Sequence, residues 1–211
     1  MRYRMPDEAR PCAALPGSHA AMIAARYGTT RGLARLALAH LQVSAGLAAR
    51  KPARAADVRR FVFVCQGNIC RSAFADRLAR DLGFDAISFG LSTDAGKAAH
   101  PPALAAAAAL GVDLRDHVTR RVQDYVPQPG DLLLAMEVRQ LARIAANPAL
   151  TALPRDLLGR YARPPRPHLH DPFGLGDAYM ATCLAVIRSA VLTLAARHPG
   201  AKVFPISSAN R

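Results

Sequence analysis

The feature that most constrains the fold is an apolar run that ends in a short loop and passes directly into a helical pattern. The run is Phe61-Val62-Phe63-Val64, and its unbroken hydrophobicity is typical of a strand buried on both faces of a parallel sheet. Eight residues follow it, Cys65-Gln66-Gly67-Asn68-Ile69-Cys70-Arg71-Ser72, and then Phe74, Leu78 and Leu82 recur at helical spacing. A strand, a tight loop and a helix in this order direct backbone N–H groups toward one point, which predicts an anion site.

The chain beyond this loop alternates strand and helix patterns. The expected strands are 86–89, 132–136 and 157–158, and the expected helices are 73–82, 103–110, 137–146 and 177–197. This alternation predicts an α/β fold, a doubly wound four-stranded parallel sheet with helices on both faces. Ligands of such sheets bind beyond the carboxyl ends of the strands, where Cys65 lies. A further strand at 202–206 is a candidate without a predicted neighbour.

The first part of the chain is a basic, Ala- and Arg-rich extension over residues 1–57, and we expect a separate domain at 58–211. Residues 1–60 hold 11 Arg or Lys and 3 Asp or Glu, out of a formal charge of +13 for the chain. Residues 18–48 predict one or two helices that break near 28–30. Three readings stay open: a solvated arginine-rich surface, an amphipathic element at a membrane surface, and a start codon assigned too early.

Composition narrows the class of protein further. The four cysteines, Cys12, Cys65, Cys70 and Cys183, are too few and too irregularly spaced for a secreted disulfide scaffold, so we expect a cytoplasmic protein. We expect no apolar run long enough to span a bilayer. No nucleic-acid motif and no interleaved aromatic residues accompany the basic charge, so a nucleic-acid partner is not expected.

Cys65 and Arg71 place a nucleophile and a cation in the same loop. The thiolate is the form of cysteine that attacks, and a helix N-terminus and a guanidinium both stabilise it. A cation at a helix start is unfavourable unless an anion binds there, and the planar guanidinium matches two oxygens of a phosphate. Gly67 and Asn68 are suited to the left-handed backbone that a tight cradle needs. These residues predict phosphoryl-transfer chemistry.

The string from Val64 to Ser72 resembles the signature of the low-molecular-weight protein tyrosine phosphatases. The resemblance extends over residues 58–198, with 89–101 and 131–137 similar to later segments of that family and Asp171-Pro172 where the family has its general acid. Ala73 departs from the family's usual Pro. The resemblance implies metal-independent hydrolysis of protein phosphotyrosine through a phosphocysteine, with no cofactor.

Roles for individual residues follow from this resemblance. Cys65 is the expected nucleophile, Arg71 the phosphate clamp, and Asp171 the acid that protonates the leaving phenolate and then the base that activates water. The phosphate-binding loop comprises Gln66, Gly67, Asn68, Ile69, Cys70, Arg71 and Ser72. In the family, Asn68 would fix the loop, and Ser72 would donate a hydrogen bond to the thiolate; a simple helix cap is the other reading of Ser72.

Three loop residues bear on substrate and regulation. Ile69 favours phosphotyrosine, because arginine phosphatases of the resembling family have Thr there. Cys70 is expected either to form a reversible disulfide with Cys65 or to pack as a small residue. Phe173 is expected either to flank the substrate ring or only to pack. The partner implied is a phosphotyrosine protein, for example a bacterial tyrosine kinase of polysaccharide export.

Two other functions compete with phosphatase activity. A thioredoxin-coupled arsenate reductase needs further cysteines in mid-domain, and residues 71–182 contain none. A non-catalytic phosphate-binding module would be expected to lack Cys65 or Asp171. His168 and His170 suggest a zinc site with the loop cysteines, but the loop is committed to another shape, so we expect no metal. His170 either tunes Asp171 or is a solvated loop residue.

Overall fold

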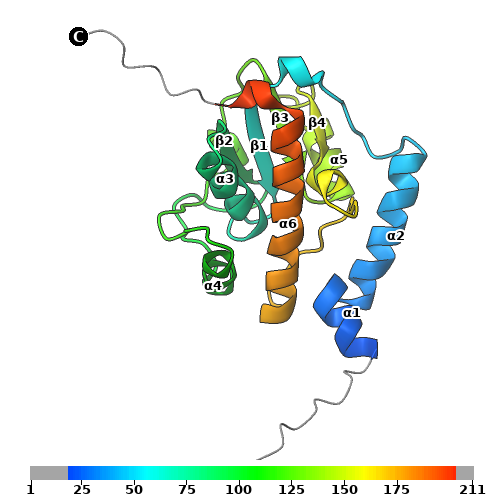
Figure 1. The fold of residues 1–211 in the computed structure, drawn as a ribbon. Helices are drawn as coiled ribbons and strands as arrows, with labels where there is room; N and C mark the ends of the chain where they lie inside the picture. The colour runs from blue at the N-terminus through cyan, green and yellow to red at the C-terminus, as the bar shows by residue number, and fades with distance from the viewer. Residues whose placement is uncertain (1–18, 203–211) are drawn as a thin grey trace, which may run out of the picture.

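A computed structural model describes residues 19–202, and its centre is one parallel sheet (Figure 1). The strands are β1 (Arg60–Cys65), β2 (Ala86–Gly90), β3 (Asp131–Ala135) and β4 (Arg155–Leu157), in the order β2-β1-β3-β4. All three neighbouring pairs are parallel. The predicted fold class is therefore confirmed, although β4 lies earlier in the chain than the expected 157–158.

Helices cover both faces of this sheet. They are α1 (His19–Tyr27), α2 (Thr30–Ser44), α3 (Arg71–Asp81), α4 (Pro101–Ala109), α5 (Val138–Ala146) and α6 (Asp177–Arg197), with short 3-10 turns at Ala55–Asp57, Val122–Asp124, Leu158–Tyr161 and Pro199–Ala201. α3 and α6 pack together on one face, with α4 against α6, and α5 packs on the other face (Figure 1).

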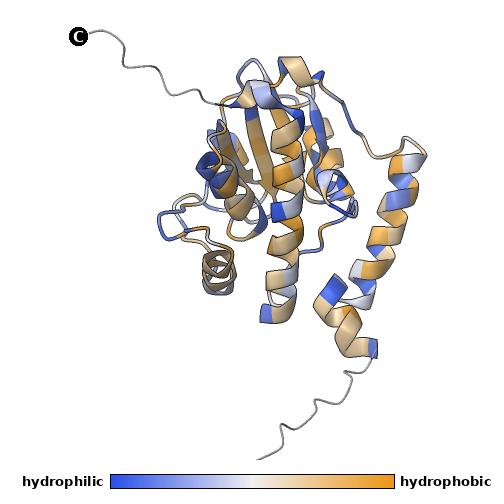
Figure 2. Ribbon diagram, in the orientation of Figure 1, coloured by the Kyte–Doolittle hydropathy of each residue, from blue (hydrophilic) through white to orange (hydrophobic). Residues whose placement is uncertain are grey.

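Alternate residues of the central strand face the two helical layers. Phe61 and Phe63 pack in the core beneath α3 and α6, whereas Val62 and Val64 pack in the core beneath α5. All four side chains are fully buried, and each contributes on the order of 1.5–3 kcal/mol of hydrophobic stabilisation. Most of β1 is accordingly orange in Figure 2. This double burial explains why the strand reads as an unbroken apolar run.

α6 corrects the expectation about membrane-spanning length. Among the described residues this one helix is long and apolar enough to cross a bilayer, and 56% of its apolar window is buried within the fold. The side chains predicted for its apolar stripe are all buried: Met180, Cys183, Leu184, Ile187, Val191 and Leu194. The hydrophobicity of α6 therefore reflects its place in the core.

The N-terminal extension contacts the rest of the chain at several places. α1 packs against α2 and α6, and Gly28 at φ +79° makes the turn between α1 and α2. Lys51, expected in a linker, exchanges two backbone hydrogen bonds with Arg155 of β4 and so extends the sheet edge. The division at residue 57 and contact of the extension with a membrane stay predictions. The loop expected at 1–17 and most of the candidate strand at 202–206 lie outside the described residues.

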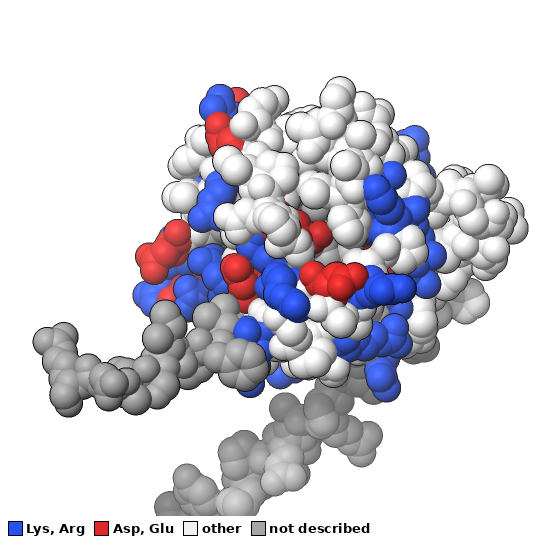
Figure 3. Space-filling view, turned by 90° about the horizontal axis from the view of Figure 1, so that it is seen from above, with Lys and Arg blue, Asp and Glu red and all other residues white. Residues whose placement is uncertain are grey.

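The basic charge is interleaved with acidic side chains on the face seen from above. Figure 3 shows that blue and red side chains alternate there and that white surface separates them. Several arginines are held in ion pairs, such as Arg121 with Asp124 and Arg60 with Asp131. On this face, therefore, acidic side chains interrupt the basic charge.

Candidate active site

The loop between β1 and α3 surrounds the sulfur of Cys65. Cys65 ends β1, whose neighbours β2 and β3 lie on opposite sides, so the loop sits where the strand order reverses. The Cys65 Sγ accepts a hydrogen bond from the backbone N–H of Asn68 at 3.2 Å and lies 2.9 Å from Ser72 Oγ. A cleft of about 180 Å³ opens over it, lined by Cys65, Gln66, Gly67, Ile69, Cys70, Arg71, Asp171 and Phe173.

Asn68 fixes the shape of the loop. Its backbone is left-handed, with φ +54°, and its side chain is buried. The Asn68 amide donates to Ser72 Oγ at 2.8 Å and to Ser88 Oγ at 2.9 Å, and its Oδ1 accepts from the backbone N–H of Arg120 at 2.9 Å. The expectation that Gly67 also has a positive φ is wrong, because Asn68 alone makes the reversal within the loop.

Ser72 is a partner of the sulfur and not a helix cap. The N-cap position of α3 is Cys70, and no side chain caps the helix there. Because Asn68 donates its amide proton to Ser72 Oγ, the hydroxyl proton of Ser72 is free to point at Cys65 Sγ. A hydroxyl donor and a backbone donor thus converge on the sulfur.

Arg71 is a fully buried cation whose orientation is fixed by two acceptors. Its Nη1 donates to Glu137 Oε1 and to the backbone oxygen of Leu169, both at 2.8 Å. Burial alone lowers the pKa of Arg71, but the charges of Asp171, Cys65 and Glu137 outweigh it and raise that pKa above its usual value. Arg71 and Arg139 likewise overcome the effect of burial on Glu137 and lower the pKa of its carboxyl. Arg71 and Glu137 therefore both stay charged in the interior.

The other edge of the Arg71 guanidinium is available to an oxyanion. Nη2 lies 2.7 Å from Asp171 Oδ2, and Nε has no hydrogen-bond partner among the described residues. Elsewhere in the chain the same Nε and Nη2 edge of Arg60 grips both oxygens of Asp131, at 2.7 and 2.8 Å. Arg71 therefore presents half of a bidentate fork to the cleft, and Asp171 occupies the other half.

Asp171 and Phe173 reach the cleft from the loop before α6. The Asp171 side chain is 34% exposed, and its Oδ1 accepts a hydrogen bond from the backbone N–H of Phe173 at 3.3 Å. Phe173 is exposed, and its ring lies 4.8 Å from the ring of His100. The structure thus brings Asp171 and Phe173 to the same cleft as Cys65, although they are more than 100 residues away in sequence.

Cys70 lies beside the nucleophile as a buried thiol. Burial raises the pKa of Cys70, and the nearby Cys65 raises it further, so Cys70 stays protonated while Cys65 is held by donors. The three described cysteines, Cys65, Cys70 and Cys183, are all free. A disulfide between Cys65 and Cys70 stays a prediction.

The two histidines before Asp171 are packed side chains, so the expectation of a solvated His170 is wrong. His168 is 7% exposed, and its Nε2 lies 3.4 Å from Nδ1 of His170. His170 Nε2 lies 3.2 Å from Oγ1 of Thr29 in the extension. The part of the chain that the structure describes holds no group of three metal-ligating side chains. The histidines serve as structural contacts here.

Burial of His168 predicts a loss of stability in mild acid. Desolvation lowers the pKa of His168 from 6.5 to about 4, despite the attraction of Glu137. The unfolded chain therefore takes up this proton first as pH falls, and the free energy of unfolding decreases between about pH 6.5 and about pH 4. At about pH 5 we expect protonation of His168 in the unfolded chain to have lowered the free energy of unfolding by about 2 kcal/mol. Urea unfolding of wild type and His168→Gln at about pH 7 and about pH 5 measures it; equal pH dependence in the two proteins would contradict this origin.

Sequence reasoning missed two side chains that hold the site in place. Glu137 is the second residue after β3, and an acidic residue directly after the expected apolar strand 132–136 was the available signal. Arg143 on α5 donates to Gln66 Oε1 at 2.8 Å and to the backbone oxygen of Leu91 at 2.9 Å. No local pattern distinguishes Arg143 from other exposed helical arginines, so only the tertiary fold reveals it.

Comparison with known proteins gives one consistent result. Residues 60–201 match the family model described as low molecular weight phosphotyrosine protein phosphatase. The chain is 34% identical over 87 residues to low molecular weight protein-tyrosine-phosphatase Wzb of Salmonella typhi, a match that covers 40% of this chain and 58% of Wzb. The chain therefore spans less than two thirds of that relative.

Solved structures extend the similarity to the whole domain. Tyrosine phosphatase AmsI of Erwinia amylovora is 26% identical with a TM-score of 0.57, and the match covers 66% of this chain and 92% of AmsI. Tyrosine phosphatase Wzb from Escherichia coli K30, solved in complex with sulphate, is 25% identical with a TM-score of 0.57, and the match covers 66% of this chain and 98% of that one.

Proposed function

Since this chain belongs to the low molecular weight phosphotyrosine protein phosphatase family, we propose that it hydrolyses phosphotyrosine in proteins through a phosphocysteine on Cys65, with no metal ion or cofactor. The observation that carries the proposal is the convergence of three groups on one cleft: the Cys65 sulfur, the open Nε edge of Arg71 and the carboxylate of Asp171. The sulphate bound by the related Wzb of Escherichia coli K30 is a tetrahedral oxyanion of the kind this cleft would take.

In the first step the Cys65 thiolate attacks phosphorus, and the bond from phosphorus to the tyrosine oxygen breaks. The phosphoryl oxygens lie on the backbone N–H groups of the loop and on the Nε and Nη2 edge of Arg71, which neutralises their charge. The phosphate thereby displaces the Asp171 carboxylate from Arg71. Asp171 then takes up a proton from solvent and delivers it to the departing phenolate.

In the second step water attacks the phosphocysteine. The Asp171 carboxylate takes a proton from that water, the bond from phosphorus to sulfur breaks, and Cys65 leaves as a thiolate. Ser72 Oγ, 2.9 Å from the sulfur, donates a hydrogen bond to the thiolate as it departs. Inorganic phosphate is released, and Arg71 pairs again with Asp171.

The walls of the cleft favour an aromatic ester. Ile69 and Phe173 are among the residues that line it, and their apolar surfaces suit a flat phenyl ring. We propose a phosphotyrosine protein as the partner, with bacterial tyrosine kinases of polysaccharide export as candidates. We place the enzyme in the cytoplasm, because a nucleophilic thiol requires a reducing compartment. Capture of tyrosine-phosphorylated proteins by Cys65→Ser identifies the substrate.

Replacing Asp171 with Asn tests the acid directly. We expect kcat/KM for phenyl phosphate to fall by about 10²- to 10³-fold, because a leaving group with a pKa near 10 then departs unprotonated. Hydrolysis of dinitrophenyl phosphate, whose leaving group needs no proton, should change little. Inorganic phosphate should inhibit Asp171→Asn more strongly than wild type, by about three- to tenfold, because Asp171 no longer competes for Arg71.

Two outcomes would contradict parts of the proposed function, the first the role of Asp171 and the second metal independence. Equal losses on the two substrates would show that Asp171 acts by holding the loop and not by donating a proton. Loss of wild-type hydrolysis in a metal chelator, with recovery on adding a divalent ion, would contradict metal independence.

A further inference from the structure

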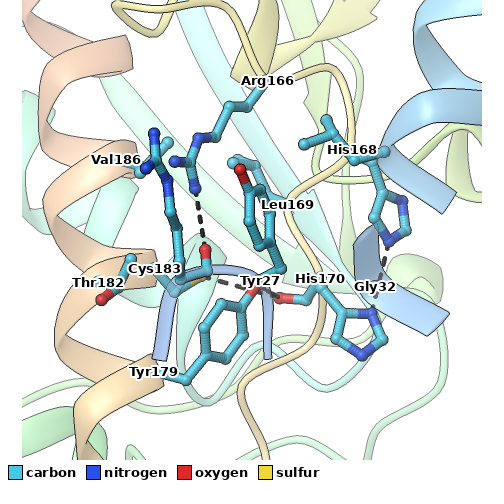
Figure 4. A pocket seen from close by; sticks show the side chains of 12 residues that line it. Tyr27, Gly32, Arg166, His168, Leu169, His170, Tyr179, Thr182, Cys183 and Val186 are labelled. Carbon is cyan, nitrogen blue, oxygen red and sulfur yellow. Dashed lines mark hydrogen bonds between the residues drawn. The ribbon is translucent and has the colours of Figure 1, made fainter. Parts of the chain in front are cut away.

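The loop that carries Asp171 rests on the turn between α1 and α2 of the N-terminal extension. Arg166 donates to the backbone oxygen of Arg26 at 3.0 Å, and its guanidinium lies 5.3 Å from the centre of the Tyr27 ring. His170 Nε2 lies 3.2 Å from Thr29 Oγ1. Figure 4 shows the His168 and His170 rings joined by a dashed line beside the helix that carries Gly32. Two residues of the 166–173 loop, Arg166 and His170, are therefore held by residues far outside the loop.

The turn is shaped to admit the His170 ring. A Cβ on Gly32 would lie 2.9 Å from His170 Cδ2, and a Cβ on Gly28 would lie 2.8 Å from Tyr179 and 2.9 Å from His170 Cδ2. Both glycines are buried, and Gly28 has φ +79°. The absence of side chains at these two positions lets the imidazole sit against the backbone of the turn. Thr29, between them, can then reach the ring.

The hydrogen bonds of this contact run in one direction. Both histidines are neutral, because burial lowers the pKa of His168 to about 4 and also lowers that of His170. The ionised Glu137 lies 4.0 Å from His168 Nδ1, and its charge favours the tautomer with a proton on that nitrogen. His168 Nε2 is then an acceptor for the Nδ1 proton of His170, and His170 Nε2 is an acceptor for the Thr29 hydroxyl. The hydroxyl of Thr29, which also accepts from the backbone N–H of Gly32 at 2.9 Å, ends the chain.

This chain of contacts includes His170 and flanks Leu169, the two residues directly before Asp171. Leu169, between the two histidines, accepts from Arg71 through its backbone oxygen and donates to Met136 at 2.9 Å. His170 is the residue directly before Asp171. A shift of His170 would therefore move the Asp171 carboxylate relative to Arg71 and the Cys65 sulfur, and proton transfer is sensitive to displacements of this kind.

We propose that Thr29 of the N-terminal extension is a positioning residue for Asp171, acting through the imidazole of His170. The extension is then part of the catalytic apparatus and not an appendage. This inference rests on the proposed function, since it assigns to Thr29 the placement of the general acid.

The test compares Thr29→Val, which removes the hydroxyl at nearly constant volume, with Thr29→Ser, which keeps it. For Thr29→Val we expect kcat/KM on phenyl phosphate to fall by about five- to tenfold, with less than about a twofold change on dinitrophenyl phosphate. Thr29→Ser should match wild type on both substrates. The dependence on the leaving group is the signature of a misplaced acid, which a general loss of folding would not produce.

A matched control separates this role from helix capping, because Thr29→Val also removes the N-cap of α2. Leu38→Gly weakens α2 by a comparable amount, about 1 kcal/mol, at an exposed position. Leu38→Gly should show no dependence on the leaving group. If it reproduces the Thr29→Val pattern, or if Thr29→Val matches wild type, the inference is wrong. If Asp171→Asn itself lacks the leaving-group effect, the proposed function fails instead.

Discussion

Cys65→Ser should reduce hydrolysis of p-nitrophenyl phosphate below detection, by at least about 10⁴-fold. A hydroxyl is far less acidic than a thiol and is not appreciably ionised by the donors that stabilise a thiolate here, so the nucleophile is lost. The loop should keep its shape, because the three hydrogen bonds of the Asn68 side chain, to Ser72, Ser88 and the Arg120 backbone, do not involve the sulfur. Cys65→Ser should therefore still bind inorganic phosphate and phosphotyrosine peptides.

The covalent intermediate gives an independent readout of the same residue. Enzyme quenched during turnover should carry a phosphoryl group on the peptide that contains Cys65, detected by mass spectrometry. Cys183→Ser, a substitution of the buried α6 cysteine, should still form this adduct on Cys65. Measurable turnover by Cys65→Ser, or a phosphoryl group on another residue, would overturn the phosphocysteine route.

Arg71→Ala should remove both activity and a large part of the stability. Without the fork, transition-state charge on the phosphoryl oxygens is uncompensated, and we expect turnover to fall by about 10³-fold or more. Glu137 would lose its buried cation and keep only the exposed Arg139 as an ion-pair partner, so the cost of breaking a buried pair, about 3–5 kcal/mol, is the upper bound of the expected loss. Urea unfolding and steady-state kinetics measure the two effects separately.

Two further variants keep this prediction testable if Arg71→Ala fails to fold. Arg71→Ala combined with Glu137→Gln also removes the buried carboxylate charge, so the double variant should regain much of the stability and none of the activity. Arg77→Ala, nearly two turns further along α3, removes a partly exposed arginine paired with Asp81 and should change stability by about 0.5 kcal/mol or less. An active double variant would exclude Arg71 as the phosphate clamp.

The main elements of the fold were predictable because burial leaves a direct trace in the sequence. β1 is buried on both faces, so all its residues are apolar except at the ends, and α6 lies in the core, so its buried stripe repeats at helical spacing. The boundaries of β4 were less clear, because Arg155 and Asp156 are polar. Their partners, the backbone oxygen of Ala49 and the side chain of Arg50, come from the distant extension.

The geometry of the site was predictable only where its residues are close together in the sequence. A strand followed by a phosphate-binding loop places Cys65, Asn68, Arg71 and Ser72 together whatever surrounds them, because short-range backbone geometry determines their relation. Cys65 and Asp171 are joined only through the packing of the loop before α6. The sequence motif indicates Asp171, but its distance to Arg71 is a property of the folded chain.

The sequence by itself determined that this chain has a parallel α/β sheet and an oxyanion loop at the end of its first strand. The sheet follows from local hydrophobic periodicity, and the loop follows from residues that are close neighbours in the sequence. Only the tertiary structure decided that Glu137 fixes the buried guanidinium, that Asn68 and not Gly67 reverses the loop, and that Thr29 contacts His170 from 141 residues away. Such contacts depend on how distant segments pack against each other. The sequence pattern of one strand or helix does not show which other segment will lie beside it.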